Sequence, residues 1–386
     1  MKRSLLRGKI VRRDNTKQGA ILIENGIILD SDYHGDVPEN TKVTDFGERY
    51  ILPGFVELHA HGGGGDDFGD CTAEAFTRIC DLHLSHGVTR ICPTLTACDW
   101  ESTLTFLRLC KNMRTHPMFA GAHLEGPFLS PKMSGAQNTA RLRLPNEKDA
   151  ETLCSYGDVI SRITLAPELA GADDFARRLL SAGIALSIGH SDADADTVRR
   201  AVVLGYTQVT HLYCSTASRR KKGSYVVGGL VEAALTEDAL TVELIGDGHH
   251  ICRESFLLTM RCKGADGVCV VSDAMRAAGQ TDVKESYLGA KQPENRVIIE
   301  DGVAKLPDRS SFAGSVAVGD TMVNALCGKY GIDICTVSGM MSRVPSRLLY
   351  GKGKYGEIAS GFAADLAVLD TDYKTYAVYL DGKRVR

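Results

Sequence analysis

Eight short apolar runs, separated by longer amphipathic or polar stretches, constrain the fold of this chain more than any other feature. The runs lie between residues 51 and 290, where strand-like and helix-like segments alternate as repeated βα units require. The predicted strands are Phe55–His59, Val88–Cys92, Ala120–Leu124, Arg162–Ala166, Ile184–Ile188, Thr207–Leu212, Thr241–Ile245 and Val268–Ser272. Eight such units predict an α/β fold, a (β/α)8 barrel of the TIM type, with its chemistry at the carboxyl ends of the strands.

Several of the intervening stretches have the pattern of amphipathic helices. The predicted helices are Thr72–His86, Asp99–Arg114, Asp173–Ala182, Asp194–Leu204 and Arg253–Lys263. A glycine just beyond a helix is typical of its end, because it adopts the left-handed conformation that closes the last turn. Such glycines follow four predicted helices, at Gly87, Gly183, Gly205 and Gly264.

The two ends of the chain differ from its centre. Short β-like runs separated by turn residues occupy Met1–Tyr50, and two more cover Ala363–Leu369 and Thr375–Leu380. We expect the ends to pair into a small β-sandwich domain of residues 1–50 and 360–386, beside a barrel domain of residues 51–359. A length of 386 residues suits one large domain with a smaller companion.

The composition is that of an ordinary globular protein. It is 44% hydrophobic and 24% charged with a net charge of -3, so neither nucleic acid nor an anionic membrane is an expected partner. The segment Met1–Arg13 lacks the apolar centre of a signal peptide, and we expect a cytoplasmic protein. The twelve cysteines are scattered without a C-x-x-C pair, which predicts reduced thiols used mainly as buried apolar residues.

Two histidines stand at the end of the first predicted strand. His59 and His61 are two residues apart, so their side chains point to the same side of a strand and can reach one ion. A chance pair of surface histidines would give the same motif, but the apolar strand before it and the glycine run Gly62–Gly65 after it favour a metal site. That glycine run lacks the lysine and hydroxyl residue of a P-loop, so we do not expect a nucleotide.

Four further strand ends carry a potential ligand or acid/base group: Glu125, His190, His211 and Asp273. Each alone is equally compatible with a capping or core polar residue. Together they predict a metal centre, because a barrel brings all its strand ends to one mouth. Imidazole and carboxylate ligands suit zinc or a related divalent ion, which lowers the pKa of water toward neutrality.

The sequence resembles the N-acetylglucosamine-6-phosphate deacetylase family of the amidohydrolase superfamily over nearly its whole length. The strings most specific to this branch are H-L-E-G-P-F at His123–Phe128 and D-A-M at Asp273–Met275. Further matches are Pro53–Phe55, His59–Gly63, Gly189–Ser191, Thr210–Tyr213 and Asp247–His250.

The resemblance implies a deacetylase that hydrolyses the N-acetyl amide of N-acetylglucosamine 6-phosphate, or of a closely related amino-sugar phosphate, with one or two divalent ions, zinc being favoured. It implies that Glu125, His190 and His211 hold the principal ion, and that His59 and His61 share Glu125 with a second. Asp273 is implied as a metal ligand and as the base acting on water. The resemblance also implies a homodimer.

The resemblance together with the local sequence predicts the residues around the substrate. They are Ala136, Gln137, Cys214, Ser215, Arg220, Lys222, His250, Phe312, Ala313 and Gly314. Gln137 stands where the family usually has a histidine thought to polarise the scissile carbonyl. A glutamine amide still donates a hydrogen bond to an oxyanion but carries no positive charge, so we assign Gln137 a catalytic role without charge.

Two points stay open at the level of sequence. The basic cluster Arg219–Lys222 is either a phosphate grip or a solvated loop, because the family's phosphate-binding arginine cannot be placed by spacing. The altered regions at Gln137 and Cys214 are also compatible with a related amidohydrolase acting on another amide or a cyclic ureide. A third alternative, an inactive barrel used as a scaffold, is disfavoured because all six potential ligands are present.

Overall fold

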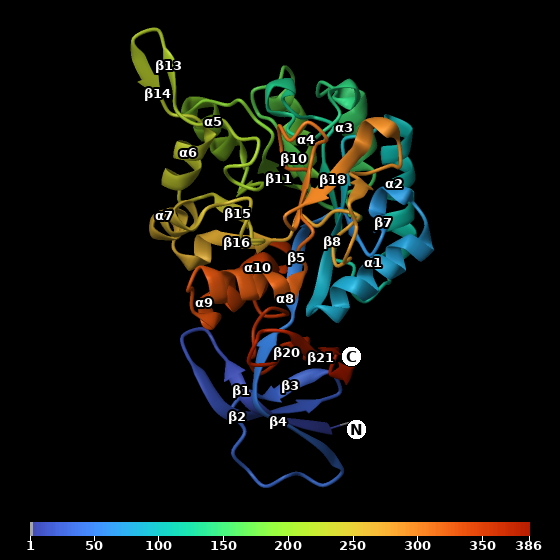
Figure 1. The fold of residues 1–386 in the computed structure, drawn as a ribbon, viewed down its shortest axis with the longest axis vertical. Coiled ribbons are helices and arrows are strands. Elements are labelled where there is room, and N and C mark those ends of the chain that lie inside the picture. Colours follow the sequence, from blue (N-terminus) through green and yellow to red (C-terminus); the bar gives the residue numbers. More distant parts are fainter. Residues whose placement is uncertain (1–2) are drawn as a thin grey trace.

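The computed structural model describes residues 3–386, and its main body is an eight-stranded parallel barrel (Figure 1). The strands follow the order β16-β15-β12-β11-β10-β9-β8-β5. Their bounds are β5 (Phe55–Ala60), β8 (Val88–Thr96), β9 (Ala122–Glu125), β10 (Ile160–Leu165), β11 (Ala185–Ile188), β12 (Gln208–Val209), β15 (Thr241–Ile245) and β16 (Val268–Val271). The eight predicted strands are confirmed, with ends that differ by a few residues.

The barrel is nearly closed between its first and last strands. Asp273 N donates to His59 O at 2.9 Å, and Ala60 and Ala274 form a parallel bridge. The last strand end, which carries Asp273, therefore lies beside the first, which carries His59.

Helices cover the outside of the barrel. They are α1 (Ala73–Ser85), α2 (Trp100–Met113), α3 (Glu147–Cys154), α4 (Ala172–Ser181), α5 (Ala195–Leu204), α6 (Leu230–Thr236) and α7 (Arg253–Lys263). The five predicted helices are among them. Gly87 and Gly205 follow α1 and α5 with φ of 90° and 119°, the left-handed conformation expected of a helix end.

Three short helices follow the barrel: α8 (Gly319–Asn324), α9 (Ile334–Ser338) and α10 (Val344–Tyr350). Two π-helical turns, η6 (Ala325–Lys329) and η7 (Gly339–Arg343), separate them. Figure 1 shows α8, α9 and α10 between the barrel and a second sheet.

The second sheet combines strands from both chain ends, in the order β22-β21-β20-β4-β1-β2-β3. Its strands are β1 (Arg3–Val11), β2 (Thr16–Glu24), β3 (Ile27–Asp30), β4 (Thr41–Pro53), β20 (Leu366–Leu369), β21 (Thr375–Leu380) and β22 (Lys383–Arg384). The ends meet where β20 pairs antiparallel with β4, and Leu6, Ile10 and Leu366 belong to one buried cluster. The proposed domain boundaries, 1–50 with 360–386 and 51–359, stay a prediction.

The loops at the barrel mouth contain small sheets. They comprise β6 (Gly62–Gly63) with β7 (Asp66–Asp67), β13 (Arg220–Lys222) with β14 (Tyr225–Val227), and β17 (Glu285–Tyr287) with β18 (Arg296–Glu300) and β19 (Val303–Lys305). Figure 1 shows the β13–β14 hairpin projecting from the upper left of the barrel. Short 3-10 turns are η1 (Phe68–Asp70), η2 (Pro131–Met133), η3 (Thr139–Arg141), η4 (Ala265–Gly267) and η5 (Pro293–Asn295).

All twelve cysteines are unpaired, but only five are buried and Cys252 and Cys262 are exposed, so the prediction that most are buried is wrong. Among the helices formed by residues 3–386, none has both the length and the apolar character needed to cross a membrane.

Candidate active site

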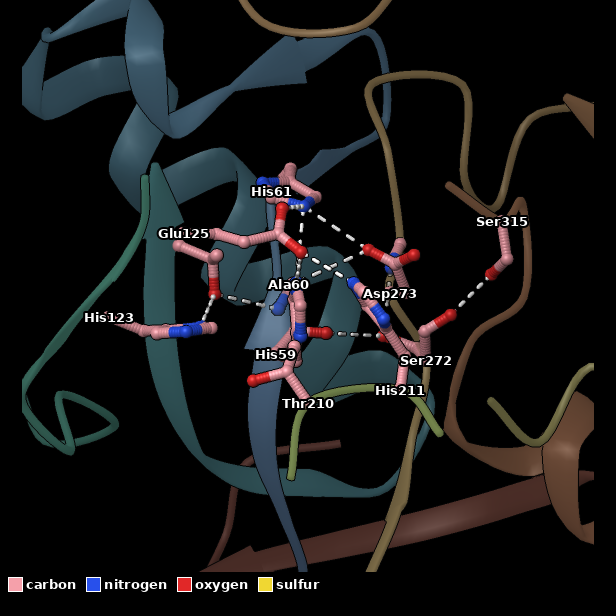
Figure 2. A network of polar contacts seen from close by, with 12 residues as sticks. His59, Ala60, His61, His123, Glu125, Thr210, His211, Ser272, Asp273 and Ser315 are labelled. Carbon is pink, nitrogen blue, oxygen red and sulfur yellow. Dashed lines mark hydrogen bonds and ion pairs between the residues drawn. The ribbon is translucent and has the colours of Figure 1, made fainter. Parts of the chain in front are cut away.

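All six predicted ligands lie together at the carboxyl end of the barrel, with His190 Nε2 3.1 Å from Glu125 Oε1. Figure 2 shows the side chains of His59, His61, Glu125, His211 and Asp273 pointing toward one another. The first two come from β5 and the segment after it, Glu125 ends β9, and the others follow β12 and β16. Because the barrel closes between β16 and β5, ligands far apart in sequence become neighbours.

One group of ligand atoms is made by His59, His61 and Asp273, with Glu125 beside it. His59 Nε2 lies 3.3 Å from His61 Nε2 and 3.4 Å from Asp273 Oδ1, and His61 Nε2 lies 3.1 Å from Asp273 Oδ1. Ligands about 2.0–2.1 Å from a tetrahedral ion are separated by roughly 3.3 Å. The donor atoms therefore have the spacing and the chemistry that a divalent ion requires.

A second group of candidate ligand atoms surrounds Glu125 Oε1. Glu125 Oε1 lies 2.6 Å from His211 Nε2, 3.1 Å from His190 Nε2 and 3.5 Å from His59 Nε2. The imidazole of His190 is oriented by its other nitrogen, since His190 Nδ1 lies 2.8 Å from Met133 O. Glu125 thus touches both groups and is placed to serve two ions.

Three of these ligands have an unusual backbone. His190, His211 and Asp273 have positive φ of 47°, 28° and 50°, which is uncommon for residues with a side chain. Such conformations persist only where surrounding contacts impose them, and they gather at functional sites. At Asp273 these contacts include Ser315 N, which donates to Asp273 O at 2.7 Å, so the chain turns there and aims the carboxylate into the mouth.

The charges in the cluster are strongly coupled. Burial would lower the pKa of His61, but hydrogen bonds to Asp273 and Glu125 raise it to about 9. Burial also opposes the charge of His59, yet Glu125 and Asp273 raise the pKa of His59 well above its usual range. Burial would raise the pKa of Glu125, but the neighbouring histidines hold it well below that range. The two buried carboxylates therefore favour positive charge close to them.

A buried ion pair lies under the ligands, and the sequence analysis did not identify it. Glu243 Oε2 lies 3.3 Å from His59 Nδ1, and Glu243 Oε1 pairs with Arg162. Burial would raise the pKa of Glu243, but the charge of Arg162 and the contact with His59 lower it to about 2. The available signal was a charged residue in each of two mainly apolar predicted strands, Glu243 in the middle of one and Arg162 at the start of the other.

A cavity of about 250 Å3 opens above the ligands. Seven of the predicted substrate-contacting residues line it: Ala136, Gln137, Cys214, Ser215, His250, Phe312 and Gly314. Sequence reasoning missed Tyr213, Ile245, Leu288 and Ser311, which also line it. Leu288 and Ser311 come from segments adjoining the β17–β18–β19 sheet, whose position over the mouth no local pattern predicts.

The remaining predicted contacts lie outside this cavity. Ala313 is fully buried and packs with Met275 and Ala304. Arg220 and Lys222 are exposed on the β13–β14 hairpin, and Arg220 Nη1 pairs with Asp192 Oδ1 at 2.7 Å. Substrate contact by these residues stays a prediction.

Gln137 joins the cavity to the ligands. Ala97 N donates to Gln137 Oε1 at 2.8 Å, so the amide nitrogen faces the ligand cluster. Gln137 Nε2 donates one hydrogen to Glu125 Oε2 at 2.6 Å. The second hydrogen of this amide is then free for an oxygen bound in the cavity.

His250 is another residue that lines the cavity. Its Nδ1 lies 2.7 Å from Asp247 Oδ2, and its ring centroid is 4.7 Å from that of Phe312. His249 N and His250 N both donate to Asp247 Oδ1, which fixes the turn. His250 therefore lines the cavity, and its contact with the substrate stays a prediction.

The chain matches known proteins over its whole length. It is 30% identical over 394 residues to N-acetylglucosamine-6-phosphate deacetylase from Bos taurus, covering 99% of this chain and 93% of that one. It is 27% identical over 386 residues to N-acetylgalactosamine-6-phosphate deacetylase from a Shewanella strain, covering 97% and 94%.

Solved structures agree with these sequence matches. A mutant of N-acetyl-D-glucosamine-6-phosphate deacetylase from Mycobacterium smegmatis, in complex with N-acetyl-D-glucosamine-6-phosphate, superposes with a TM-score of 0.91, 26% identity and 100% coverage of both chains. The N-acetylglucosamine-6-phosphate deacetylase from Thermotoga maritima gives a TM-score of 0.85, 28% identity and 98% coverage of both.

Residues 50–385 match the Amidohydrolase family, whose members are metal-dependent hydrolases, and the resemblance inferred from the motifs is confirmed. The chain belongs to the amidohydrolase family, in its N-acetylglucosamine-6-phosphate deacetylase branch.

Proposed function

We propose that the protein hydrolyses the N-acetyl amide of N-acetylglucosamine 6-phosphate, or of a closely related amino-sugar phosphate, to acetate and the amino-sugar phosphate. The observation that carries this proposal is the group of His59, His61, Glu125, His211 and Asp273 directly below a cavity of about 250 Å3. The names of the relatives, which act on two epimeric amino-sugar phosphates, support the same substrate class.

The proposed metal centre uses these ligands together with His190. We propose zinc as the ion, because imidazole and carboxylate donors at tetrahedral spacing suit it, with one or two ions per chain. A bound divalent ion supplies Lewis acidity, which makes water acidic enough to react near neutral pH.

Asp273 is the proposed base. Its Oδ1 points into the cluster, where it takes a proton from the attacking water and then delivers that proton to the amide nitrogen. An amine leaves readily only after its nitrogen is protonated, so one carboxylate serves both halves of the reaction. The free N–H of Gln137 meets the carbonyl oxygen as negative charge develops there.

The function is tested with a panel of substrates. Purified protein with Zn2+ is assayed for acetate release from N-acetylglucosamine 6-phosphate, N-acetylgalactosamine 6-phosphate and N-acetylglucosamine, and for opening of a cyclic ureide. We expect the two phosphorylated sugars to give the highest kcat/KM. Turnover of the unphosphorylated amide or the ureide alone would support the alternative amidohydrolase. A protein without bound metal and without activity after reconstitution would support the scaffold.

The basic hairpin is tested separately. If Arg220 and Lys222 bind the phosphate, changing both to glutamine raises KM for the phosphorylated sugar far more than for the unphosphorylated one, because charge-assisted bonds to phosphate are lost. Equal effects on both substrates would make the hairpin a solvated loop.

We also propose a cytoplasmic homodimer. The substrate is a phosphorylated metabolite, and the hairpin that carries Arg220 also exposes Tyr225 and Val226, so an apolar surface is available to a second copy. Light scattering of the purified protein measures the mass that this proposal requires.

A further inference from the structure

The ion pair between Arg162 and Glu243 is the most deeply buried pair of opposite charges near the active site. Arg162 lies on β10 and Glu243 on β15, and their exposed fractions are 0% and 1%. Burying two charges costs several kcal/mol each, and an apolar pair of similar volume often fills such a space with equal or greater stability. Stabilisation of the fold alone therefore does not explain this ion pair, and a second role is indicated.

Glu243 connects this pair to the ligands. While Oε1 faces Arg162, Oε2 lies 3.3 Å from His59 Nδ1 and accepts a hydrogen bond from His211 N at 3.3 Å. When His59 Nδ1–H donates to this oxygen, Nε2 presents its lone pair to the cluster. A metal-binding histidine needs such a partner to fix its tautomer and ring orientation.

Among residues 3–386, Glu243 is the only hydrogen-bond partner of His59 Nδ1. The neighbouring ring of His123 packs edge-on against the ring of His59, with centroids 4.7 Å apart. The two ring nitrogens of His123, however, contact Thr94 Oγ1 at 3.2 Å and Thr164 Oγ1 at 2.8 Å. His123 therefore supports the ring of His59 sterically, and Glu243 alone orients its Nδ1.

His59 is also the residue common to both candidate groups of ligands, one with Glu125 and His211 and the other with His61 and Asp273. We infer that Glu243, held in place by Arg162, is a positioning residue that orients His59 and the backbone of His211 for binding metal in both groups. Sequence motifs do not include it, since its strand reads as an ordinary apolar segment. The inference rests on the proposed metal centre and deepens it.

The test measures Zn2+ affinity by competition with a chelator, independently of turnover. Glu243→Gln keeps the volume but turns an amide toward Arg162 and weakens the acceptor of His59. We expect the apparent Kd of every ion bound by the wild type to rise about 10- to 100-fold, as loss of such a partner of a metal ligand typically gives. The melting temperature is recorded for each variant.

A matched control separates positioning from loss of stability. Arg90 and Asp365 form another buried ion pair, at 2.7 Å, whose contacts do not include a metal ligand. Asp365→Asn is expected to lower the melting temperature while leaving the Kd for Zn2+ unchanged. Equal losses of Zn2+ affinity in Asp365→Asn and Glu243→Gln would overturn the inference.

A second variant keeps the inference testable if the unpaired Arg162 prevents Glu243→Gln from folding. The double variant Arg162→Met/Glu243→Leu replaces the ion pair with apolar side chains, which is often neutral or stabilising, and still removes the acceptor of His59. We expect it to fold and to bind Zn2+ weakly. Wild-type affinity in either folded variant would overturn the inference, whereas a wild-type protein that binds no Zn2+ would overturn the proposed metal centre itself.

Discussion

Gln137 makes two contacts in the active site, and substitutions can separate their effects. Its Oε1 accepts from the backbone of Ala97 at 2.8 Å, and its Nε2 donates to Glu125 at 2.6 Å. The side chain is 8% exposed, so neither contact is readily replaced by water. Gln137→Ala removes both contacts together with the hydrogen proposed to meet the substrate carbonyl.

The expected magnitudes follow from these contacts. Leaving the buried Ala97 N without an acceptor costs about 1–3 kcal/mol of folding free energy. Removing one donor to a developing oxyanion lowers kcat by about 100- to 1,000-fold, which is roughly 2.7–4 kcal/mol of transition-state stabilisation. The two losses appear in different measurements, because unfolding reports the first and steady-state kinetics the second.

Two further variants make this prediction sharper. Gln137→Glu keeps an oxygen for Ala97 N but lacks an N–H and places a carboxyl group beside Glu125, so kcat should fall as far as in Gln137→Ala. Gln137→His introduces the residue usual in the family and keeps an N–H, so it should retain most of the turnover. Metal content is measured for each variant. If Gln137→Ala keeps its metal and stays within a few-fold of wild-type kcat, Gln137 is not the oxyanion donor.

Three other outcomes are expected. Asp273→Asn should retain most of its metal while kcat falls by at least about 100-fold; near-normal turnover with metal bound would remove Asp273 from the chemistry. His211→Ala should lose the principal ion, whereas changing His59 and His61 together should affect a second ion selectively; metal analysis checks both. Burial lowers the pKa of His83 to about 4, below the value near 6.5 of an unfolded chain. The unfolded state therefore takes up a proton first, so this part of the stability is full above pH 6.5 and is lost as pH falls toward 4. His83→Gln should flatten the decline of the melting temperature in that window, and an unchanged decline would contradict the assignment.

The convergence of the candidate ligands was predictable because the pattern of strands and the residue types at the strand ends agree. The alternation of apolar and amphipathic segments predicts a barrel whose strand ends lie at one mouth. The histidines and carboxylates at those ends indicate a metal site. His59 and Asp273 illustrate this, since they are 214 positions apart in the sequence and yet their side-chain atoms lie 3.4 Å apart. Closure of the barrel between β16 and β5 supplies the contact without any local signal.

The loops and the interior were less predictable, for two different reasons. Leu288 and Ser311 reach the cavity because tertiary packing places a small sheet over the mouth, which the spacing of residues does not encode. A single carboxylate in T-V-E-L-I hardly changes an apolar strand pattern, so the pattern does not single out Glu243, although the residue is buried and contacts both Arg162 and His59. A charged residue inside a buried strand is thus a stronger signal than its local hydrophobicity suggests.

The arrangement of charge explains how the ligands can be gathered before any metal binds. Glu125 and Asp273 would repel each other if nothing lay between them, but the imidazoles of His59 and His61 lie beside both carboxylates, which raise the pKa values of these histidines. A divalent ion would compete with protons for these imidazoles within a site that the barrel already holds in place, so its affinity would depend on pH and would not include the cost of folding. Zinc fingers differ because they order their ligands only as the metal binds.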